Sequence, residues 1–416
     1  MTPTRRVIAD LRELSARTST ADGAQRLAWG PVWRDARPWF KDKIAEIGLE
    51  IVTDSAGNNW VTLPGASPRT VIVGSHLDSV PNGGWLDGCL GLAAALEALR
   101  IQAAAGKPPV TMRLVDWADE EGARFGRSLL GSSAAAGILN IDEIRELKDR
   151  QGTRLTDALA ENGVAIGTMS NAHRELKAID AHAYLELHIE QGPVLESMQK
   201  PTGVVLGTFG VERHMIRFTG QAAHSGSTPI PMRRDAFLAA AQTALACREI
   251  ALLHSKPRAG VVCTVGVVNV EPKIVTAVPG VCEISLDQRS LDADVLAAML
   301  RDTREESAHC ARENNVAVEW KSLWRINPRP FDLDLIRLCE EAVREETGDA
   351  PRLPSGPLHD AAEMVPHMPV VMMFAYSSNG LSHCKEEDTP EAHLEKTIRA
   401  YLRLVDKTMA HVARRV

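Results

Sequence analysis

Along most of the chain, short apolar runs typical of strands alternate with segments in which apolar residues recur at helical spacing. Val71–Val73 and Val110–Val115 are short runs of the kind that form strands buried on both faces. Each is followed by polar residues, and Leu90–Arg100 between them reads as a helix. This order predicts an α/β protein with a parallel or mixed sheet covered by helices.

After about residue 207 the pattern becomes β-α-β-β-α-β, which is the ferredoxin-like plan. Its predicted elements are, in order, the strand Glu212–Thr219, the helix Arg234–Leu253, the strands Val261–Val270 and Val281–Arg289, the helix Asp292–Asn314 and the strand Val316–Trp320. A further polar motif around His383 lies beyond this unit. We therefore predict a first domain made of residues 1–209 and 326–416, with an inserted α+β domain over 210–325.

The composition agrees with two domains and with a reduced environment. A chain of 416 residues that is 44% hydrophobic exceeds the ~250–300 residues at which single cores stop growing. The net charge is −7 and the basic residues form no block, which argues against nucleic-acid binding. Seven cysteines without a C-x-x-C pair favour a cytoplasmic location. We also expect no signal peptide and no membrane association, because no window reaches ~18 consecutive apolar residues.

Candidate chemistry follows the first of these strands. His76 and Asp78 lie at i and i+2, so on an extended chain they point the same way. Asp87 precedes the helix Leu90–Arg100. In an open α/β sheet such a loop lies at the carboxyl end of a strand, where ligands usually bind. A surface hydrogen-bonded pair is the alternative that this stretch alone leaves open.

The second strand is followed by Asp116–Gly122, which holds four acids in six residues. A solvated acidic loop would explain this stretch taken singly. Together, however, the imidazole and carboxylates of successive strand ends form a ligand set that suits zinc, manganese or cobalt. Leu185–Pro193 alternates apolar and polar residues and puts His188 on the polar face, and Gly380–His383 follows a further apolar run.

Several long motifs along the chain resemble the M20-type di-metal amidohydrolases. The resemblance is to the branch of N-carbamoyl-L-amino acid hydrolases, β-ureidopropionases and allantoate amidohydrolases. The motifs, in the family's order, are GSHLDSVPNGGWLDG, DWADEEGARF, HIEQGPVLE, GQAAHSGSTP, AVPG with SLDQR, PSGPLHDAAEM and GLSHCKEEDTPEAHLE. The resemblance implies a mixed-sheet di-metal catalytic domain with a ferredoxin-like lid domain that also forms a homodimer.

Carried over position by position, the resemblance implies two divalent ions per subunit, Zn²⁺ or Mn²⁺, Co²⁺ or Ni²⁺. Asp87 is implied to bridge them. His76 and His188 would complete the ligands of one ion, and Glu121 and His383 those of the other. The alternative for any one of these histidines is a surface or hydrogen-bonded core imidazole.

The resemblance also implies roles beside the ions. Glu120 would be the general base, and Asp78 would orient His76. Gln191 would hold the substrate, and His224 would stabilise the oxyanion in the partner subunit's site. Arg289 would clamp the substrate carboxylate, a task suited to a bidentate guanidinium, although a strand-end salt bridge is the alternative.

Two departures concern the substrate. The family usually has Asn where this chain has Thr276, whose side chain is shorter and reaches a substrate carboxylate or ureide less easily. The frequent S-G-A-G-H-D-A motif is replaced by SGPLHDA over Ser355–Ala361. Both changes leave the implied metal ligands intact, so they bear on the substrate rather than on the reaction.

We therefore predict an enzyme that hydrolyses the ureido C–N bond of N-carbamoyl-L-amino acids, or of a β-ureido acid, to amino acid, ammonia and CO2. Hydrolysis of an N-acyl amino acid, a dipeptide or allantoate is the enzymatic alternative. A metal-binding dimer without turnover is the alternative of another class. An unliganded acid such as Glu120 beside the ions argues against it, because a structural site has no use for such a group.

Overall fold

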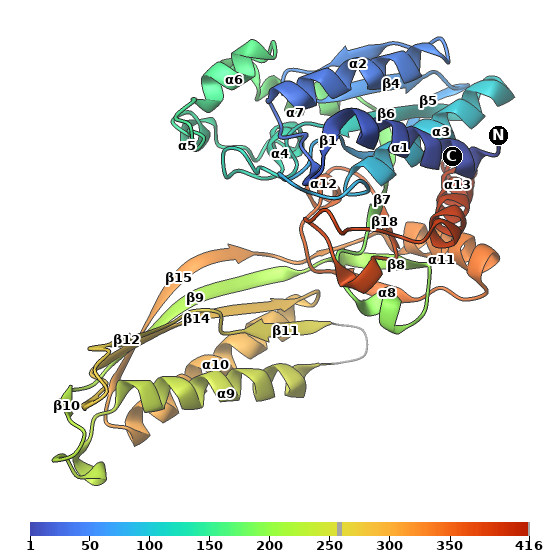
Figure 1. The fold of residues 1–416 in the computed structure, drawn as a ribbon. Helices are drawn as coiled ribbons and strands as arrows, with labels where there is room; N and C mark the ends of the chain where they lie inside the picture. The colour runs from blue at the N-terminus through green and yellow to red at the C-terminus, as the bar shows by residue number, and fades with distance from the viewer. Residues whose placement is uncertain (256–259, 415–416) are drawn as a thin grey trace. The chain divides into compact units, whose positions relative to one another are not determined.

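The computed structural model describes residues 1–255 and 260–414. Its contacts divide the chain into two compact units. Unit 1 comprises residues 1–206, 331–353 and 358–416, and unit 2 comprises 207–330 and 354–357. Figure 1 shows the helices and strands of each unit.

Unit 1 is built on a mixed sheet in the strand order β8-β18-β7-β5-β6-β4-β3, with β17 paired to β8. β5, β6, β7 and β18 run parallel, whereas β3, β4 and β8 pair antiparallel to their neighbours. The bounds are β3 (Ile51–Thr53), β4 (Asn59–Leu63), β5 (Ser67–His76), β6 (Val110–Trp117), β7 (Ala181–Ile189), β8 (Thr202–Thr208), β17 (Arg352–Ser355) and β18 (Val370–Ala375). The α/β class with a mixed sheet is thus confirmed.

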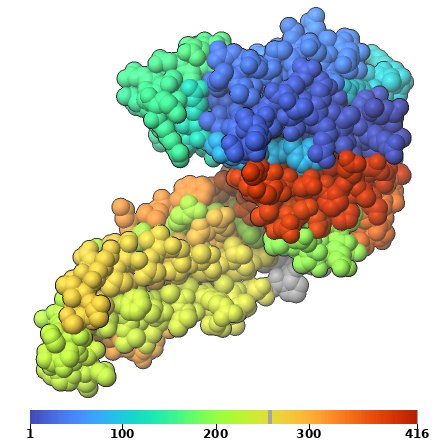
Figure 2. All heavy atoms as spheres, viewed as in Figure 1, coloured from blue at the N-terminus to red at the C-terminus, as the bar shows by residue number. Residues whose placement is uncertain are grey.

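Helices pack against the strands of this sheet. α3 and α13 contact each other and β5, β6 and β7, while α12 contacts β7, β18 and α4. The helices of unit 1 are α1 (Pro3–Thr18), α2 (Pro31–Ala45), α3 (Cys89–Ala105), α4 (Leu130–Ala136), α5 (Ile141–Ile144), α6 (Leu155–Glu161), α7 (Asn171–Lys177), α8 (Val194–Ser197), α11 (Leu333–Thr347), α12 (Asp360–Met364) and α13 (Glu391–Arg414). The first and last of these, α1 and α13, pack side by side, and Figure 2 shows the blue N-terminal segment next to the red C-terminal segment.

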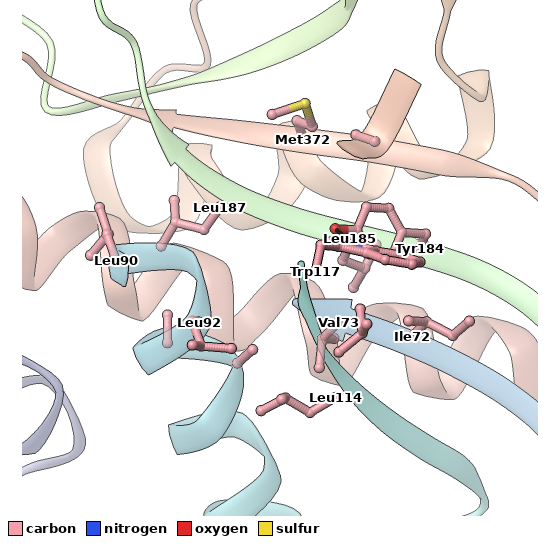
Figure 3. Close-up of a cluster of buried hydrophobic side chains, with 14 of the residues drawn as sticks. Ile72, Val73, Leu90, Leu92, Leu114, Trp117, Tyr184, Leu185, Leu187 and Met372 are labelled. Atoms are coloured by element: carbon pink, nitrogen blue, oxygen red, sulfur yellow. Dashed lines mark hydrogen bonds between the residues drawn. The ribbon is translucent and has the colours of Figure 1, made fainter. Parts of the chain in front are cut away.

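The core of unit 1 lies around the parallel strands. Val73, Leu114, Leu185 and Met372, one from each of these strands, are fully buried (Figure 3). β7 is buried from Ala183 to Ile189, so it is covered on both faces. The polar residues of the alternating segment, Glu186 and His188, share one face of β7, and this face is buried as well.

Unit 2 contains an antiparallel sheet in the order β11-β14-β9-β15, with β12 also paired to β14. Its main elements are β9 (Gly210–Thr219), α9 (Ala236–His254), β11 (Val261–Thr264), β12 (Val268–Glu271), β14 (Val281–Ser290), α10 (Ala293–Glu313) and β15 (Ala317–Ile326). The short β10 (Ala223–His224) pairs with β13 (Ala277–Val278). The helices α9 and α10 pack on this sheet. Of the two, α9 is both long and strongly apolar.

The single strand predicted over Val261–Val270 is broken in the structure. The Ser285 hydroxyl accepts hydrogen bonds from the backbone N–H groups of Gly266 and Val267, at 3.1 and 2.9 Å. These N–H groups therefore bond a side chain instead of continuing the ladder, and the chain divides into β11 and β12.

Candidate active site

The candidate metal ligands of unit 1 collect at the carboxyl ends of its parallel strands. β5 ends at His76, β6 leads into the loop with Glu120 and Glu121, and β7 carries His188 near its end. His383 follows β18. This edge of an open α/β sheet is where ligands usually bind.

Asp87 lies between two groups of ligand atoms. Its Oδ1 is 3.1 Å from His188 Nε2 and 3.8 Å from His76 Nε2. Its Oδ2 is 3.3 Å from His383 Nε2, which is itself 3.4 Å from Glu121 Oε2. One oxygen thus faces each group, and both groups are compact enough to hold a metal ion. This is the arrangement required of a bridging carboxylate.

The chain holds Asp87 in place through its last loop. Glu387 Oε1 accepts hydrogen bonds from the backbone N–H groups of Leu86 and Asp87, at 3.1 and 3.0 Å. Ser382 Oγ lies 3.1 Å from Asp87 Oδ2 and 3.0 Å from Glu387 Oε2. Gly88, with φ +66°, follows Asp87, and a Cβ there would lie 2.3 Å from the ring of His76. Only glycine therefore lets the loop pass the imidazole.

The residues present fit a pair of divalent cations. His76 Nε2 and Glu121 Oε1 are buried and have no hydrogen-bond partner within the described ranges, which is unusual unless an ion binds them. Burial, then the charge of Asp87, raises the pKa of Glu121 well above its usual range. Burial lowers the pKa of His76 to about 3, which keeps this imidazole neutral, as metal ligation requires. Buried carboxylates packed this closely need positive charge, and nitrogen and oxygen donors of this kind suit zinc or manganese.

Glu120 lies beside these groups without belonging to either of them. Its side chain is buried, and Oε2 is 3.8 Å from His76 Nε2. Burial, followed by the charges of Asp360 and Glu121, raises the pKa of Glu120 well above its usual range. A carboxyl group that lies beside the ligand groups without belonging to them is placed where a general base would be.

Asp78 is placed to fix the acidic loop as well as His76. Its two carboxylate oxygens accept hydrogen bonds from the backbone N–H groups of Glu120 and Glu121, both at 3.2 Å. The Asp78 carboxylate is 3.6 Å from His76 Nδ1, and that nitrogen is closer, at 3.2 Å, to the Asp78 backbone oxygen. Asp78 therefore links the end of β5 to the loop after β6.

Gln191 reaches the ligand groups directly. Its Nε2 donates to Asp87 Oδ2 at 2.9 Å and lies 3.2 Å from His383 Nε2. Gln191 and His383 both have positive φ, at 57° and 58°. Such backbone strain is typical of functional sites, where the surrounding structure enforces it.

Three buried residues near this cluster were not predicted from the sequence: Glu186, His359 and Asp360. Glu186 and His359 form a further compact group of ligand atoms with His188, and the rings of His188 and His359 are 4.3 Å apart. Glu186 Oε1 accepts a hydrogen bond from Ser75 Oγ at 2.9 Å. The negative charge of Asp360 contributes to the raised pKa of Glu120. The HDA triplet within Ser355–Ala361 is the sequence signal for His359 and Asp360.

Thr276, His224 and Arg289 belong to unit 2. His224 is exposed, and its Nδ1 accepts hydrogen bonds from the N–H groups of Gly226 and Ser227, at 3.1 and 3.2 Å. The proton of the neutral ring is therefore on Nε2, which is left as a donor. Thr276 shares this loop, because its carbonyl accepts from Ser225 N at 2.9 Å.

Arg289 lies at the opposite end of the sheet of unit 2. It is eight residues along β14 from Val281, next to β13, a span of about 26 Å at 3.3 Å per residue. Its Nε donates to Asp287 Oδ1 at 2.8 Å and its Nη1 to Gly356 O at 3.1 Å. The three residues of unit 2 implied to contact substrate therefore do not form one cluster within a subunit.

Residues 72–407 match the model of peptidase family M20/M25/M40. The chain is 33% identical to an allantoate amidohydrolase of Escherichia coli, over 89% of each chain. It is 34% identical to an N-carbamoyl-L-amino acid amidohydrolase of Geobacillus stearothermophilus, over 88% of each. A solved hydantoinase/carbamoylase family amidase from Burkholderia multivorans superposes with a TM-score of 0.87 at 30% identity, covering 97% of both chains.

Paired ligand groups at the ends of parallel strands are an arrangement suited to metal-dependent hydrolases. The chain belongs to peptidase family M20/M25/M40. Within it, the chain is an amidohydrolase of the branch that acts on C–N bonds other than peptide bonds. The predicted family membership and enzyme class are therefore confirmed.

Proposed function

We propose that the enzyme hydrolyses the ureido C–N bond of N-carbamoyl-L-amino acids, giving the amino acid, ammonia and CO2. Asp87 supports this proposal, because it offers one oxygen to each of two ligand groups and Glu120 lies beside them. Two divalent ions, when bound, would supply Lewis acidity towards the ureido carbonyl and acidify a water molecule.

The side chains around this centre have separate tasks in the proposed reaction. Glu120 takes a proton from the attacking water and delivers it to the leaving nitrogen. Gln191, bonded to Asp87, orients the ureido group. Arg289 binds the substrate carboxylate, and the Nε2–H of His224 stabilises the developing oxyanion. In this scheme only the last two contacts come from unit 2.

The separation of Arg289 from His224 within unit 2 supports a homodimer. One small substrate cannot touch both ends of a sheet about 26 Å apart, so the two contacts would come from different subunits. We propose that Arg289 serves the site of its own subunit and that His224, with Thr276, serves the partner's. The outer side of α9 offers an apolar surface for this dimer, because Leu238, Leu245 and Leu252 recur every seven residues and are 49%, 72% and 57% exposed.

A groove beside Arg289 favours N-carbamoyl amino acids over allantoate. It encloses about 590 Å³, and its lining includes the apolar side chains of Phe209, Met215, Val262, Val267 and Leu323. Such walls suit a substrate with one carboxylate and an apolar side chain, whereas allantoate carries a second ureido group in that place. Allantoate stays the second candidate substrate, because the allantoate amidohydrolase is about as similar to this chain as the N-carbamoyl-L-amino acid amidohydrolase is.

A substrate panel tests the proposal. The manganese-, cobalt- and zinc-loaded enzyme is incubated with N-carbamoyl-, N-acetyl- and dipeptide forms of one apolar amino acid and with allantoate, and ammonia and amino acid are assayed. The N-carbamoyl compound should give the highest kcat/KM. A higher value for allantoate or for the N-acetyl compound would reject the proposed substrate, and no turnover with any metal would leave a metal-binding dimer.

A mixed-dimer experiment tests the proposed exchange of residues. His224→Ala and Glu120→Gln should each be nearly inactive, since oxyanion donors and general bases contribute ~10²–10³ and ~10²–10⁴ in rate. In a heterodimer one site combines an intact Glu120 with an intact His224, so up to half of one dimer's activity should return. Heterodimers that form, as tagged pull-down would detect, but stay inactive would place His224 in its own subunit's site or in none.

A further inference from the structure

Two arginines share a single carboxylate on the sheet of unit 2. Asp287 on β14 is directly opposite Arg213 on β9 in the strand register, and Arg289 is two residues further along β14 on the same face. Arg213 donates through Nε at 2.9 Å and Nη2 at 2.6 Å to Asp287 Oδ2. Arg289 donates through Nε to Oδ1 at 2.8 Å and through Nη2 to Oδ2 at 3.2 Å.

This contact occupies only one edge of the Arg289 guanidinium. A guanidinium has five N–H donors, and its two terminal nitrogens form a second edge suited to a carboxylate. Asp287 takes the Nε–Nη2 edge, and Gly356 O takes one N–H of Nη1. Among the described residues, one N–H on each terminal nitrogen is left for a ligand. Asp287 therefore orients Arg289 without blocking it.

The charges explain why a second arginine is needed. Asp287 alone would neutralise Arg289 and weaken its attraction for an anion. Burial acts against ionisation, but hydrogen bonds from Arg289 and Arg213 lower the pKa of Asp287, so this carboxylate stays charged. Two guanidinium groups around one carboxylate leave a net charge of +1. Arg213 is held on its other side by Trp324, whose ring centroid lies 5.1 Å from its Cζ.

We propose that Asp287 and Arg213 are positioning residues for recognition of the substrate carboxylate. Asp287 fixes the guanidinium of Arg289 through its side edge, and Arg213 cancels the charge of Asp287, so that the free edge of Arg289 stays positive in the apolar groove. This inference rests on the proposed function, because it assumes that Arg289 binds the substrate carboxylate. Arg213 acts through Arg289 and does not contact the substrate.

The same two strands provide a matched control. Arg217 on β9 pairs with Glu283 on β14 at 2.7 Å, across directly opposed positions on the same face as Arg213 and Asp287. Arg217→Met and Arg213→Met therefore each remove one partly exposed arginine from a cross-strand ion pair of one sheet. A loss of stability common to both variants is subtracted by the comparison.

The experiment measures binding rather than turnover. Metal-loaded Glu120→Gln enzyme is titrated by calorimetry with N-carbamoyl-L-leucine and with its carboxamide, which lacks the negative charge. Adding Arg213→Met should weaken binding of the carboxylate on the order of tenfold, as expected for one charge in a partly solvated site. Binding of the carboxamide should change less than about twofold, and Arg217→Met should leave both ligands within that limit. Arg213→Lys keeps the positive charge, so it should recover most of the lost affinity for the carboxylate. This variant is also expected to fold if Arg213→Met does not.

A background without Arg289 separates positioning from direct contact. In Arg289→Met enzyme, adding Arg213→Met should change carboxylate binding no further. If the full loss recurs in that background, Arg213 contacts the ligand itself and the inference is wrong. It is also wrong if Arg213→Met behaves like Arg217→Met, or if the parent enzyme does not prefer the carboxylate to the carboxamide.

These outcomes are distinct from failure of the proposed function. An enzyme that hydrolyses no N-carbamoyl amino acid, yet shows the Arg213-dependent preference for the carboxylate, would refute the reaction and support the positioning role. An enzyme that hydrolyses N-carbamoyl amino acids, but whose preference for the carboxylate does not depend on Arg213, would support the reaction and refute the positioning role.

Discussion

Gly88→Ala should weaken one metal site through a single added methyl group. The new Cβ would lie 2.3 Å from His76 Cε1 and 2.4 Å from its Nδ1, far inside van der Waals contact, so the imidazole has to move. The residue would also keep φ near +66°, which side chains rarely adopt. Backbone strain and overpacking each cost about 1–3 kcal/mol, so the metal-free protein should lose about 2–6 kcal/mol of its free energy of unfolding.

Gly163→Ala is the matched control, because Gly163 has φ +79° and its added Cβ would meet nothing within 4 Å. Its loss of unfolding free energy should therefore reflect backbone strain alone. Urea unfolding in chelator measures the metal-free stabilities, and titration with Zn²⁺ followed by elemental analysis measures the two sites.

The two variants should differ most in metal binding. Gly88→Ala should lose at least tenfold in affinity at the site of His76 and His188, since changes that only reorient a ligand typically cost 10–100-fold. The site of Glu121 and His383 should be affected less, and Gly163→Ala should match the wild type at both. If Gly88→Ala binds two ions with wild-type affinity, His76 is not a ligand or the loop passes it differently.

Three further outcomes are expected. Asp87→Ala should lose both ions together, and elemental analysis showing one ion at full occupancy would reject bridging. Glu120→Gln should keep both ions and lose ~10²–10⁴ in kcat, whereas a parallel loss of metal would make Glu120 a ligand. Although burial opposes it, hydrogen bonds from Arg399 and Arg403 lower the pKa of Glu346, so its contribution is present at neutral pH and is lost as pH falls below about 4.3. Glu346→Gln should cost about 1–3 kcal/mol at pH 7 and less at pH 3.5, by urea unfolding of the metal-free protein at both pH values, and an equal cost at both would contradict this.

The sequence predicted the parts of the site that follow local rules. The strands that lead to His76 and Glu120 could be predicted because β-branched runs and polar loops are local signals, although β5 continues to His76, beyond the predicted end at Val73. Glu387 could not be predicted, because its bonds to the backbone of Leu86 and Asp87 join residues about 300 positions apart. A carboxylate that serves backbone donors leaves no spacing pattern in the sequence.

Contacts between strands caused the other differences. β7 alternates in sequence, yet it is covered on both faces because Glu186 finds partners in Ser75 and Tyr184. The break between β11 and β12 depends on one hydroxyl of the neighbouring strand, at Ser285. The roles of Gln191, His224, Thr276 and Arg289 stay predictions, since geometry alone does not show what a substrate touches.

The position of β18 bears on how the chain assembles itself. This strand is made late in synthesis, yet it lies between β7 and β8, both of which precede unit 2 in the sequence. Unit 2 is almost continuous from 207 to 330, so it can fold from nearby segments while unit 1 still waits for its missing strand. We expect nascent chains that end before residue 370 to hold a folded unit 2 beside an unfinished sheet with two open edges. Such edges are prone to aggregation, so the ribosome-bound protein should depend on chaperones until β18 has emerged.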